Sequence, residues 1–252
     1  MVDAEKMSKS KGNFLTLKQA IDQFGADATR LACADAGDGL EDANFSRETA
    51  NQAILRLTTL ESFATEVMGK KGDYRRGDRT FLDEVFLNEI SRLSKEAYDG
   101  FTGMMYRESL RAGWFEMLNL KNEYQDLSNQ DMHGDVIILW LEVMAIILSP
   151  ICPHMCEHIW SVLGKEGLVV EQLWPNLPAE DSRAVHSIQR RGGFGLAAKL
   201  LRARSRLYRS QFLHVNTSTH LKAVAEIYTI HTFAQISDLN SSIKHCLFLQ
   251  TF

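Results

Sequence analysis

The chain has 252 residues, of which 45% are hydrophobic and 24% are charged, as in an ordinary soluble globular protein. Its 28 basic and 32 acidic residues leave a net charge of −4, so the overall charge does not indicate a nucleic-acid-binding protein. Its four cysteines have no regular spacing and no apolar run reaches membrane-spanning length. These features argue against a disulfide scaffold and a membrane-spanning protein, and we expect a cytoplasmic location.

The first distinctive stretch covers residues 5–13, where three lysines are interleaved with two serines and Gly12 follows the last lysine. Neither a helical nor a strand period runs through it, so we predict a loop. Lysine ammonium groups, serine hydroxyls and backbone amides beside a glycine all bind anionic oxygens. The residue types therefore indicate a phosphate-binding loop, although a solvated lysine-rich segment has the same composition.

Two short helices are predicted next. Apolar residues with helical spacing occupy positions 14–24, with Thr16 as the N-cap and Gly25 as the stop. A second helix over 27–36 ends at the turn that Gly37 and Gly39 introduce.

Longer helices follow. Ser46 is a suitable cap for a helix over 47–68, and further helical patterns cover 81–100, 104–127 and 153–163. Residues 136–148 are apolar almost all round, so this helix should lie at the centre of the fold. Short connections between antiparallel helices predict a bundle over about 47–164, followed by an extended exit over 169–175. The inward positions predicted for the first long helix are Ile54, Leu57, Leu60, Phe63, Ala64 and Val67.

Two segments of this region have alternative interpretations. The charged, glycine-rich connection over 69–79 is predicted to be a solvated loop, with contact to RNA phosphates as the alternative. The helix over 104–127 carries an aromatic stripe, which we interpret as core rather than as a platform for stacking bases. The stripe consists of Tyr106, Trp114, Phe115 and Tyr124.

The C-terminal part changes in character from about residue 187. Basic residues recur there, and no acidic residue lies between Asp181 and Glu226. Residues 197–210 could form a basic amphipathic helix that binds RNA or an anionic surface, or the tail has no partner. Beyond residue 211 no cap, turn or period is clear, and we predict loose order. The basic residues are Arg190, Arg191, Lys199, Arg202, Arg204, Arg206 and Arg209.

The segment 152–158 has the residue types of a zinc site, with Cys152, His154, Cys156 and His158. Each pair of like residues has the i, i+4 spacing that lets two ligands share a metal. However, an offset of two residues rotates the pairs by about 160° around a helix, so one helix does not direct all four side chains to one ion. We therefore expect no structural metal and interpret the cysteines as core residues.

The order of residues within the lysine-rich loop resembles a known signature. Residues 6–10, Lys-Met-Ser-Lys-Ser, with the continuation Lys-Gly-Asn and the later Gly25-Ala-Asp27-Ala-x-Arg30, are similar to the KMSKS loop region of class I aminoacyl-tRNA synthetases. Residues 30–46, 148–154 and 157–160 look most like the leucine-specific members of that family, of the cytosolic type found in eukaryotes and archaea. The resemblance covers about residues 5–175.

The resemblance implies a mainly α fold and a division of the chain into three parts. Residues 1–46 would be the KMSKS loop and the linking helices at the end of a catalytic domain. Residues 47–175 would be an antiparallel helical bundle of the anticodon-binding type. Residues 176–252 would be a divergent basic tail with loose order.

It also implies a site and its partners. In the family this loop closes over Mg-bound ATP, and Lys9 would be the main catalytic residue with Lys6 the second. Lys6, Met7, Ser8, Lys9 and Ser10 together would form the binding site for the ATP phosphates. The substrates would be ATP, leucine and tRNA(Leu), and the bundle would support tRNA docking.

The family also requires an upstream Rossmann domain with a His-x-Gly-His motif, and none of the eight histidines of this chain lies in such a motif. We therefore expect a leucine–tRNA ligase family member that is not catalytically competent alone and that uses ATP and leucine only with a complementing Rossmann domain. Three alternatives stay open. In the first, the chain is part of a larger or split enzyme. In the second, it is a non-catalytic tRNA-binding or regulatory module. In the third, it is a truncated product without function.

Overall fold

The structure consists mainly of α-helices. The computed structural model describes residues 1–39 and 42–177, and strand pairing within them is limited to three isolated bridges. The predicted fold class is therefore confirmed. Of the tail predicted over 176–252, residues 178–252 lie outside the described residues, and with them the predicted basic helix over 197–210. The helices are α1 (Leu17–Phe24), α2 (Ala26–Asp35), α3 (Arg47–Gly69), α4 (Phe81–Thr102), α5 (Tyr106–Leu110), η1 (Arg111–Glu116), α6 (Met117–Leu127), α7 (Gly134–Leu148), α8 (Pro153–Val162) and η2 (Val169–Glu171).

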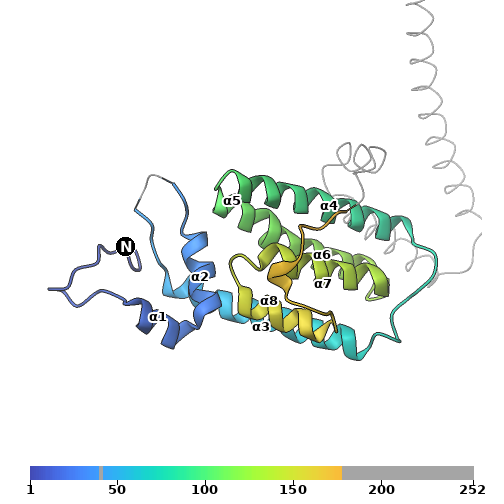
Figure 1. The fold of residues 1–252 in the computed structure, drawn as a ribbon, viewed down its shortest axis with the longest axis horizontal. Coiled ribbons are helices and arrows are strands. Elements are labelled where there is room, and N and C mark those ends of the chain that lie inside the picture. The colour runs from blue at the N-terminus through green and yellow to red at the C-terminus, as the bar shows by residue number, and fades with distance from the viewer. Residues whose placement is uncertain (40–41, 178–252) are drawn as a thin grey trace, which may run out of the picture. The chain divides into compact units, whose positions relative to one another are not determined.

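The longer helices form a bundle. Helices α3 and α4 lie on opposite sides, with α6 and α7 between them, and α8 packs beside α3 (Figure 1). Helices α1 and α2 continue the molecule beyond the N-terminal end of α3, and α2 contacts both α3 and α8. No helix in the described part of the chain has both the length and the apolar character needed to cross a lipid bilayer.

Side-chain caps fix the starts of several helices. Thr16 and Ser46 each accept a hydrogen bond from a backbone amide in the first turn of α1 and α3, as predicted. Thr80 does the same at α4, where Asp83 completes a reciprocal capping box. Each cap contributes about 1 kcal/mol to stability. Gly25 ends α1 with a φ of 79°, a conformation that favours glycine.

Helix α7 is the central helix, as its apolar sequence predicts. Its buried side chains point to all sides of the helix, so neighbouring helices surround it. Full burial of a large apolar side chain contributes about 2 kcal/mol. The buried side chains of α7 include Val136, Ile137, Trp140, Leu141, Val143, Met144, Ile147 and Leu148.

Helix α3 buries one face against this core. Leu57, Leu60, Ala64 and Val67 are buried as predicted. The predicted core positions Ile54 and Phe63 are wrong in part, because both side chains remain partly exposed. They line surface grooves that α3 forms with α8 and with α6.

The single helix predicted over 104–127 is interrupted. It consists of α5, the π-helical turn η1 and α6. Gly113 lies in η1, and a Cβ atom there would lie 2.5 Å from Cγ2 of Ile147 on α7. Glycine therefore permits the close approach of the two helices. Of the aromatic stripe, Trp114 and Tyr124 are buried as predicted, whereas Tyr106 is exposed.

The extended exit predicted over 169–175 contains a helical turn, η2. The carboxylate of Glu157 on α8 accepts hydrogen bonds from the backbone amides of Val169 and Val170, at 2.9 and 3.2 Å. These bonds satisfy the free amides at the start of the turn and explain why the chain bends there. Trp174 then donates from Nε1 to the Ser94 hydroxyl on α4, at 3.1 Å.

The connection over 69–79 is mostly exposed, as predicted, but Arg75 binds the core. Its guanidinium donates to both carboxylate oxygens of buried Asp83, at 2.8 and 2.7 Å. The Tyr124 hydroxyl donates to Asp83 at 2.5 Å and accepts from the His133 amide at 2.9 Å. Burial alone would raise the pKa of Asp83, but the hydrogen bonds from Arg75, Tyr124 and Thr80 outweigh it and lower that pKa.

Candidate functional site

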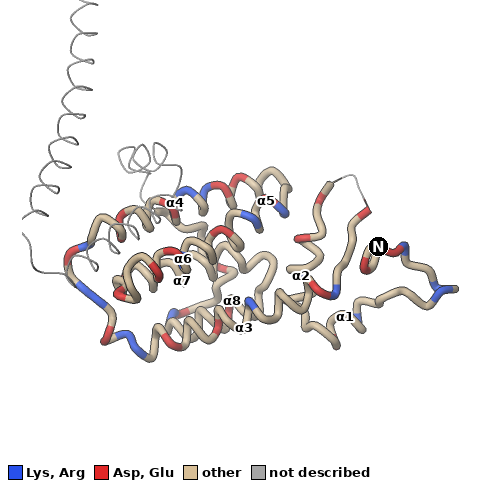
Figure 2. Tube along the Cα trace, turned by 180° about the vertical axis from the view of Figure 1, so that it is seen from behind, with Lys and Arg blue, Asp and Glu red and all other residues tan. Residues whose placement is uncertain are grey.

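Residues 5–13 form a loop before α1, as predicted. The side chains of Lys6, Met7, Lys9 and Ser10 are exposed, and Ser8 is half-buried. In Figure 2 the loop extends away from the helices, with basic residues at its tip. The Ser8 and Ser10 hydroxyls are hydrogen-bonded to each other, with 2.8 Å between the two oxygens. The structure thus brings the five predicted site residues onto one exposed loop.

The side chain of Asn13 holds this loop together. Its Oδ1 accepts from the Ser8 amide at 2.9 Å, and its Nδ2 donates to the Glu5 carboxylate at 3.1 Å and to the Lys6 carbonyl at 3.2 Å. Gly12 adds a turn with a φ of 70°. Asn13 is not among the site residues predicted from the sequence. The available signal was that an asparagine amide both donates and accepts within a turn.

The lysines of the loop carry uncompensated charge. Within residues 1–39 and 42–177, Lys6, Lys9 and Lys11 form no ion pair with a carboxylate. Other lysines of the same part of the chain do form such pairs, for example Lys18 with Asp22 at 2.6 Å. An ammonium group without a carboxylate partner is available to an external anion.

The loop is attached at its start to the N-terminal end of α3. Arg47 donates from its amide to the Asp3 carboxylate at 2.9 Å, and the two side chains form an ion pair. The Ala4 amide donates to the Asn44 side chain at 2.7 Å. The Asp3 amide donates to the Phe45 carbonyl at 2.9 Å. The loop is therefore anchored at its start on residues 44–47, and at its end it continues into α1.

A second set of contacts joins α2 to the turn between α7 and α8, and we name it the α2–α8 joint (Asp27, Arg30, Pro150, Ile151 and Met155). Asp27 accepts from the Met155 amide at 2.7 Å, at the start of α8. Arg30 donates to the carbonyls of Ile151 and Pro150, at 2.7 and 2.8 Å. The joint connects two sequence stretches that both resemble the synthetase family.

The four candidate zinc ligands lie in different environments, the two cysteines in the core and the two histidines beside carboxylates. Cys152 and Cys156 are buried, and burial raises the pKa of both thiols. His154 lies 2.9 Å from the Asp27 carboxylate, and His158 lies 3.1 Å from that of Glu61. No group of three or more His, Cys, Asp or Glu side chains suited to a metal ion occurs within the described residues.

The sequence matches two families. Residues 83–217 match "Anticodon-binding domain of tRNA ligase", and residues 1–56 match "tRNA synthetases class I (M)". The chain is 42% identical over 190 residues to a cytoplasmic leucine–tRNA ligase of Pongo abelii, covering 75% of this chain and 16% of the relative. It is 34% identical over 181 residues to a leucine–tRNA ligase of Aeropyrum pernix, covering 69% of this chain and 18% of the relative.

The fold is also similar to a solved structure. That structure is a ternary complex of a LeuRS from Agrobacterium radiobacter K84 with tRNA and LeuAMS. It aligns with a TM-score of 0.54 and 20% identity, and covers 73% of this chain and 24% of that chain. The chain spans less than a fifth of the length of the leucine–tRNA ligases of Pongo abelii and Aeropyrum pernix, at 16% and 18%.

Proposed function

We propose, from the premise that this chain belongs to the leucyl-tRNA synthetase family of class I tRNA ligases and carries its anticodon-binding domain, that its lysine loop serves the ATP-dependent attachment of leucine to tRNA(Leu). The observation that carries the proposal is the loop itself. It holds three lysines that have no carboxylate partner in the described part of the chain, and Asn13 constrains the backbone between them.

The proposed chemistry uses the lysines on the triphosphate. When the leucine carboxylate attacks the α-phosphorus of ATP, negative charge builds on the oxygens of the departing pyrophosphate. An ammonium group placed beside those oxygens binds the transition state more strongly than the ground state. We assign this role mainly to Lys9 and secondarily to Lys6, with Met7, Ser8 and Ser10 shaping the phosphate-binding loop. Loss of one such donor typically costs about 3 kcal/mol.

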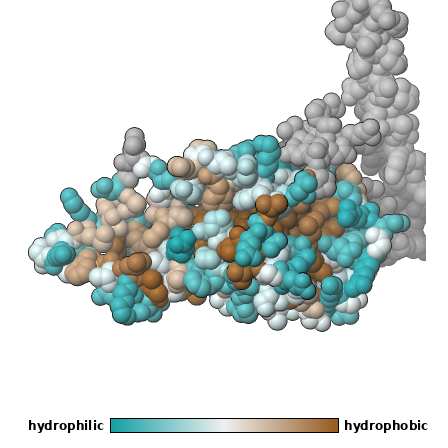
Figure 3. All heavy atoms as spheres, in the orientation of Figure 1, coloured by the Kyte–Doolittle hydropathy of each residue, from teal (hydrophilic) through white to brown (hydrophobic). Residues whose placement is uncertain are grey.

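The loop acts in this proposal together with a Rossmann-type nucleotide-binding domain, in a longer chain or in a separate polypeptide. Helix α1 offers a surface for it. Ala20 and Phe24 of α1 are buried, whereas Phe14, Leu17 and Ile21 beside them are exposed. Figure 3 shows apolar surface over this helix. An exposed apolar stripe next to the loop is typical of a contact with another domain.

The helical bundle has the second role in the proposal, which is to dock tRNA(Leu) in the cytoplasm. A second candidate function follows from the bundle alone. Helix α7 is enclosed by its neighbours, and the α2–α8 joint closes the bundle without using the lysine loop. Such a domain could serve as a non-catalytic tRNA-binding module.

Leucine-dependent ATP–pyrophosphate exchange tests the proposal. The chain is assayed alone, then mixed with a separately produced Rossmann half of a leucine–tRNA ligase, and the half is assayed alone as the control. We expect exchange only in the mixture. Exchange by the chain alone would contradict the need for a Rossmann domain. A mixture without exchange, from a chain that binds tRNA, would favour the non-catalytic module.

A further inference from the structure

A groove on the surface between α3 and α6 has an unusual charge composition. Its volume is about 300 Å³, and no acidic side chain lines it. Amide and hydroxyl groups add hydrogen-bonding capacity beside two cations and two aromatic rings. The lining includes Arg56, Thr59, Phe63, Phe115, Asn119, Lys121 and Asn122.

The two cations of the groove rest on aromatic rings. The Arg56 guanidinium lies 5.1 Å from the centre of the Phe115 ring, and the Lys121 ammonium lies 4.4 Å from the centre of the Phe63 ring. These contacts orient both cations without neutralising them. Within the described residues neither cation forms an ion pair with a carboxylate, whereas Arg92, Arg111 and most other cations of the bundle do.

Lys121 is also partly removed from water. Burial lowers its pKa, although Asp126 and Glu66 act in the opposite direction. Its hydrogen-bond partner is the neutral Gln125 side chain, at 3.4 Å. Removing a charge from water without giving it a counterion is unfavourable, so a bound anion would recover part of that cost.

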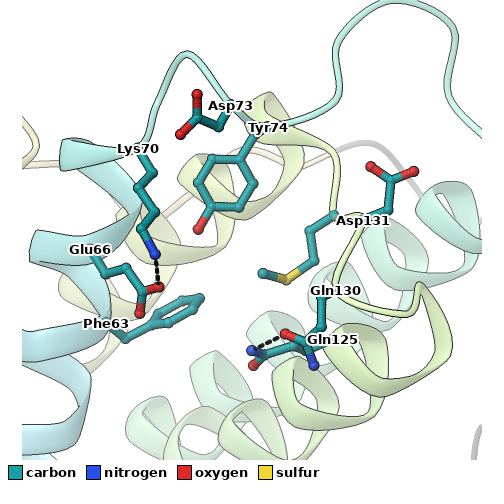
Figure 4. A pocket seen from close by; sticks show the side chains of 9 residues that line it. Phe63, Glu66, Lys70, Asp73, Tyr74, Gln125, Gln130 and Asp131 are labelled. Carbon is teal, nitrogen blue, oxygen red and sulfur yellow. Dashed lines mark hydrogen bonds and ion pairs between the residues drawn. The ribbon is translucent and has the colours of Figure 1, made fainter.

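A neighbouring cavity, on the other side of Phe63, has the opposite charge (Figure 4). Its volume is also about 300 Å³, and three carboxylates and one lysine line it. The lysine, Lys70, is paired with Glu66 at 2.8 Å, and Asp131 is paired at 3.6 Å with Arg75, which does not line the cavity. Asp73 is therefore the carboxylate of the lining that forms no ion pair within the described residues. With three carboxylates and one lysine, the lining is net negative, which is unfavourable for a phosphate group. The charge along the surface therefore changes sign at Phe63.

We propose that the groove between α3 and α6 is a binding site for the RNA backbone, in which Arg56 and Lys121 bind phosphate and the amides of Asn119 and Asn122 contact the adjoining nucleotide. The acidic cavity of Figure 4 limits the bound strand to the basic side of Phe63. Aromatic rings and side-chain amides beside the cations favour a nucleotide over an acidic peptide. The site rests on the proposed function, since it names the surface by which the bundle holds tRNA.

The test is the salt dependence of binding between the full chain and a fluorescent tRNA(Leu) transcript. The double variant Arg56→Gln/Lys121→Met retains the side-chain stems that cover both rings. We expect it to bind tRNA about tenfold more weakly at low salt. The slope of the logarithm of the association constant against the logarithm of the salt concentration should fall in magnitude by about 2, one for each lost phosphate contact. The matched control, Lys18→Gln/Lys95→Gln, removes two lysines that are paired with Asp22 and Asp99 and should keep the wild-type slope.

A further variant and a competitor separate phosphate binding from other effects. Asp73→Asn, which removes the carboxylate of the acidic cavity that forms no ion pair within the described residues, should bind as tightly as wild type or more tightly. If this variant weakened tRNA binding as much as Arg56→Gln/Lys121→Met does, the effect would not come from phosphate contacts and the proposed site would be wrong. Competition by poly-glutamate as strong as that by RNA would replace the proposal with a site for acidic peptides.

The outcomes also distinguish the site from the proposed function. If the Arg56→Gln/Lys121→Met variant bound tRNA with the affinity and the salt dependence of the wild type, the groove would not be the binding site, and the proposal that the bundle docks tRNA would still stand. No tRNA binding by wild type would overturn both. If the variant does not fold, acetylation of the wild-type protein gives the answer. Bound tRNA should protect Lys121 and leave Lys18 reactive, and equal protection of both would contradict the site.

Discussion

Asp27 and Met155 are 128 positions apart in the sequence, and a 2.7 Å hydrogen bond joins the Met155 amide to the Asp27 carboxylate. The amide lies in the first turn of α8, where backbone donors lack helical partners and a negative charge is favoured by the helix dipole. Arg30, one turn further along α2, binds the carbonyls that precede this helix. The helices that follow the lysine loop are thereby fixed to the bundle.

Replacing Asp27 should weaken this attachment. We expect Asp27→Ala to lower the free energy of unfolding by about 2 kcal/mol, since it removes a charged cap and leaves an amide unsatisfied. Urea unfolding followed by circular dichroism measures the change. Asp22→Ala is the matched control, because Asp22 is an exposed carboxylate paired with Lys18 and its loss should cost under about 0.5 kcal/mol. Equal losses in the two variants would contradict a structural role for the α2–α8 joint.

Asp83 should make the free energy of unfolding depend on pH in the acidic range. Its pKa in the folded chain lies below the ordinary value of 3.8, so the folded state holds the charge more readily than the unfolded state does. The resulting stabilisation is present above the unfolded pKa and is lost as pH falls through the folded pKa. We expect Asp83→Asn to cost about 3 kcal/mol near neutral pH, because Arg75 loses its buried partner.

The measurement is the free energy of unfolding from about pH 7 down to about pH 2. The cost of Asp83→Asn should shrink as pH falls, because the wild-type carboxyl becomes protonated. Tyr124→Phe, which removes one hydrogen bond to Asp83, should give an intermediate effect. A cost of Asp83→Asn that stays constant over this range would show that Asp83 does not titrate with folding.

Local features of the fold could be predicted from the sequence, and distant contacts could not. The caps Thr16 and Ser46 and the stop at Gly25 act within a few residues of the chain, and the continuous apolar run of α7 requires burial on all sides. The bond between Asp83 and Tyr124 joins positions 41 apart, and no local pattern signals it. The interruption at η1 depends on how closely α7 approaches, which only the assembled bundle determines.

The candidate site followed the same rule. Residue types indicated a phosphate-binding loop, and family resemblance supplied the assignment of Lys6 and Lys9. The role of Asn13 required the folded loop, because its three partners are set by the path of the backbone. The cations of the α3–α6 groove were also not predicted, since Arg56 and Lys121 come from two separate helices.

Asn13→Ala should loosen the lysine loop. The hydrogen bond from the Ser8 amide to Asn13 is the readout, and its loss should speed hydrogen exchange at that amide by about fivefold, equivalent to about 1 kcal/mol. Hydrogen exchange followed by NMR resolves the single amide. Lys11→Ala, in the same loop, should leave that exchange rate unchanged. A Ser8 amide that exchanges equally fast in wild type and Asn13→Ala would mean that Asn13 does not constrain the loop.

The most direct test of the central claim is leucine-dependent ATP–pyrophosphate exchange by the Lys9→Ala variant, mixed with a Rossmann half that supports exchange with the wild-type chain. We predict a loss of about 100-fold, as expected for removing one group that stabilises the transition state, and a smaller loss for Lys6→Ala. Lys18→Ala, which removes an ion-paired lysine from α1, should retain the wild-type rate. A Lys9→Ala mixture that exchanges as fast as wild type would contradict the assignment of the lysine loop to ATP.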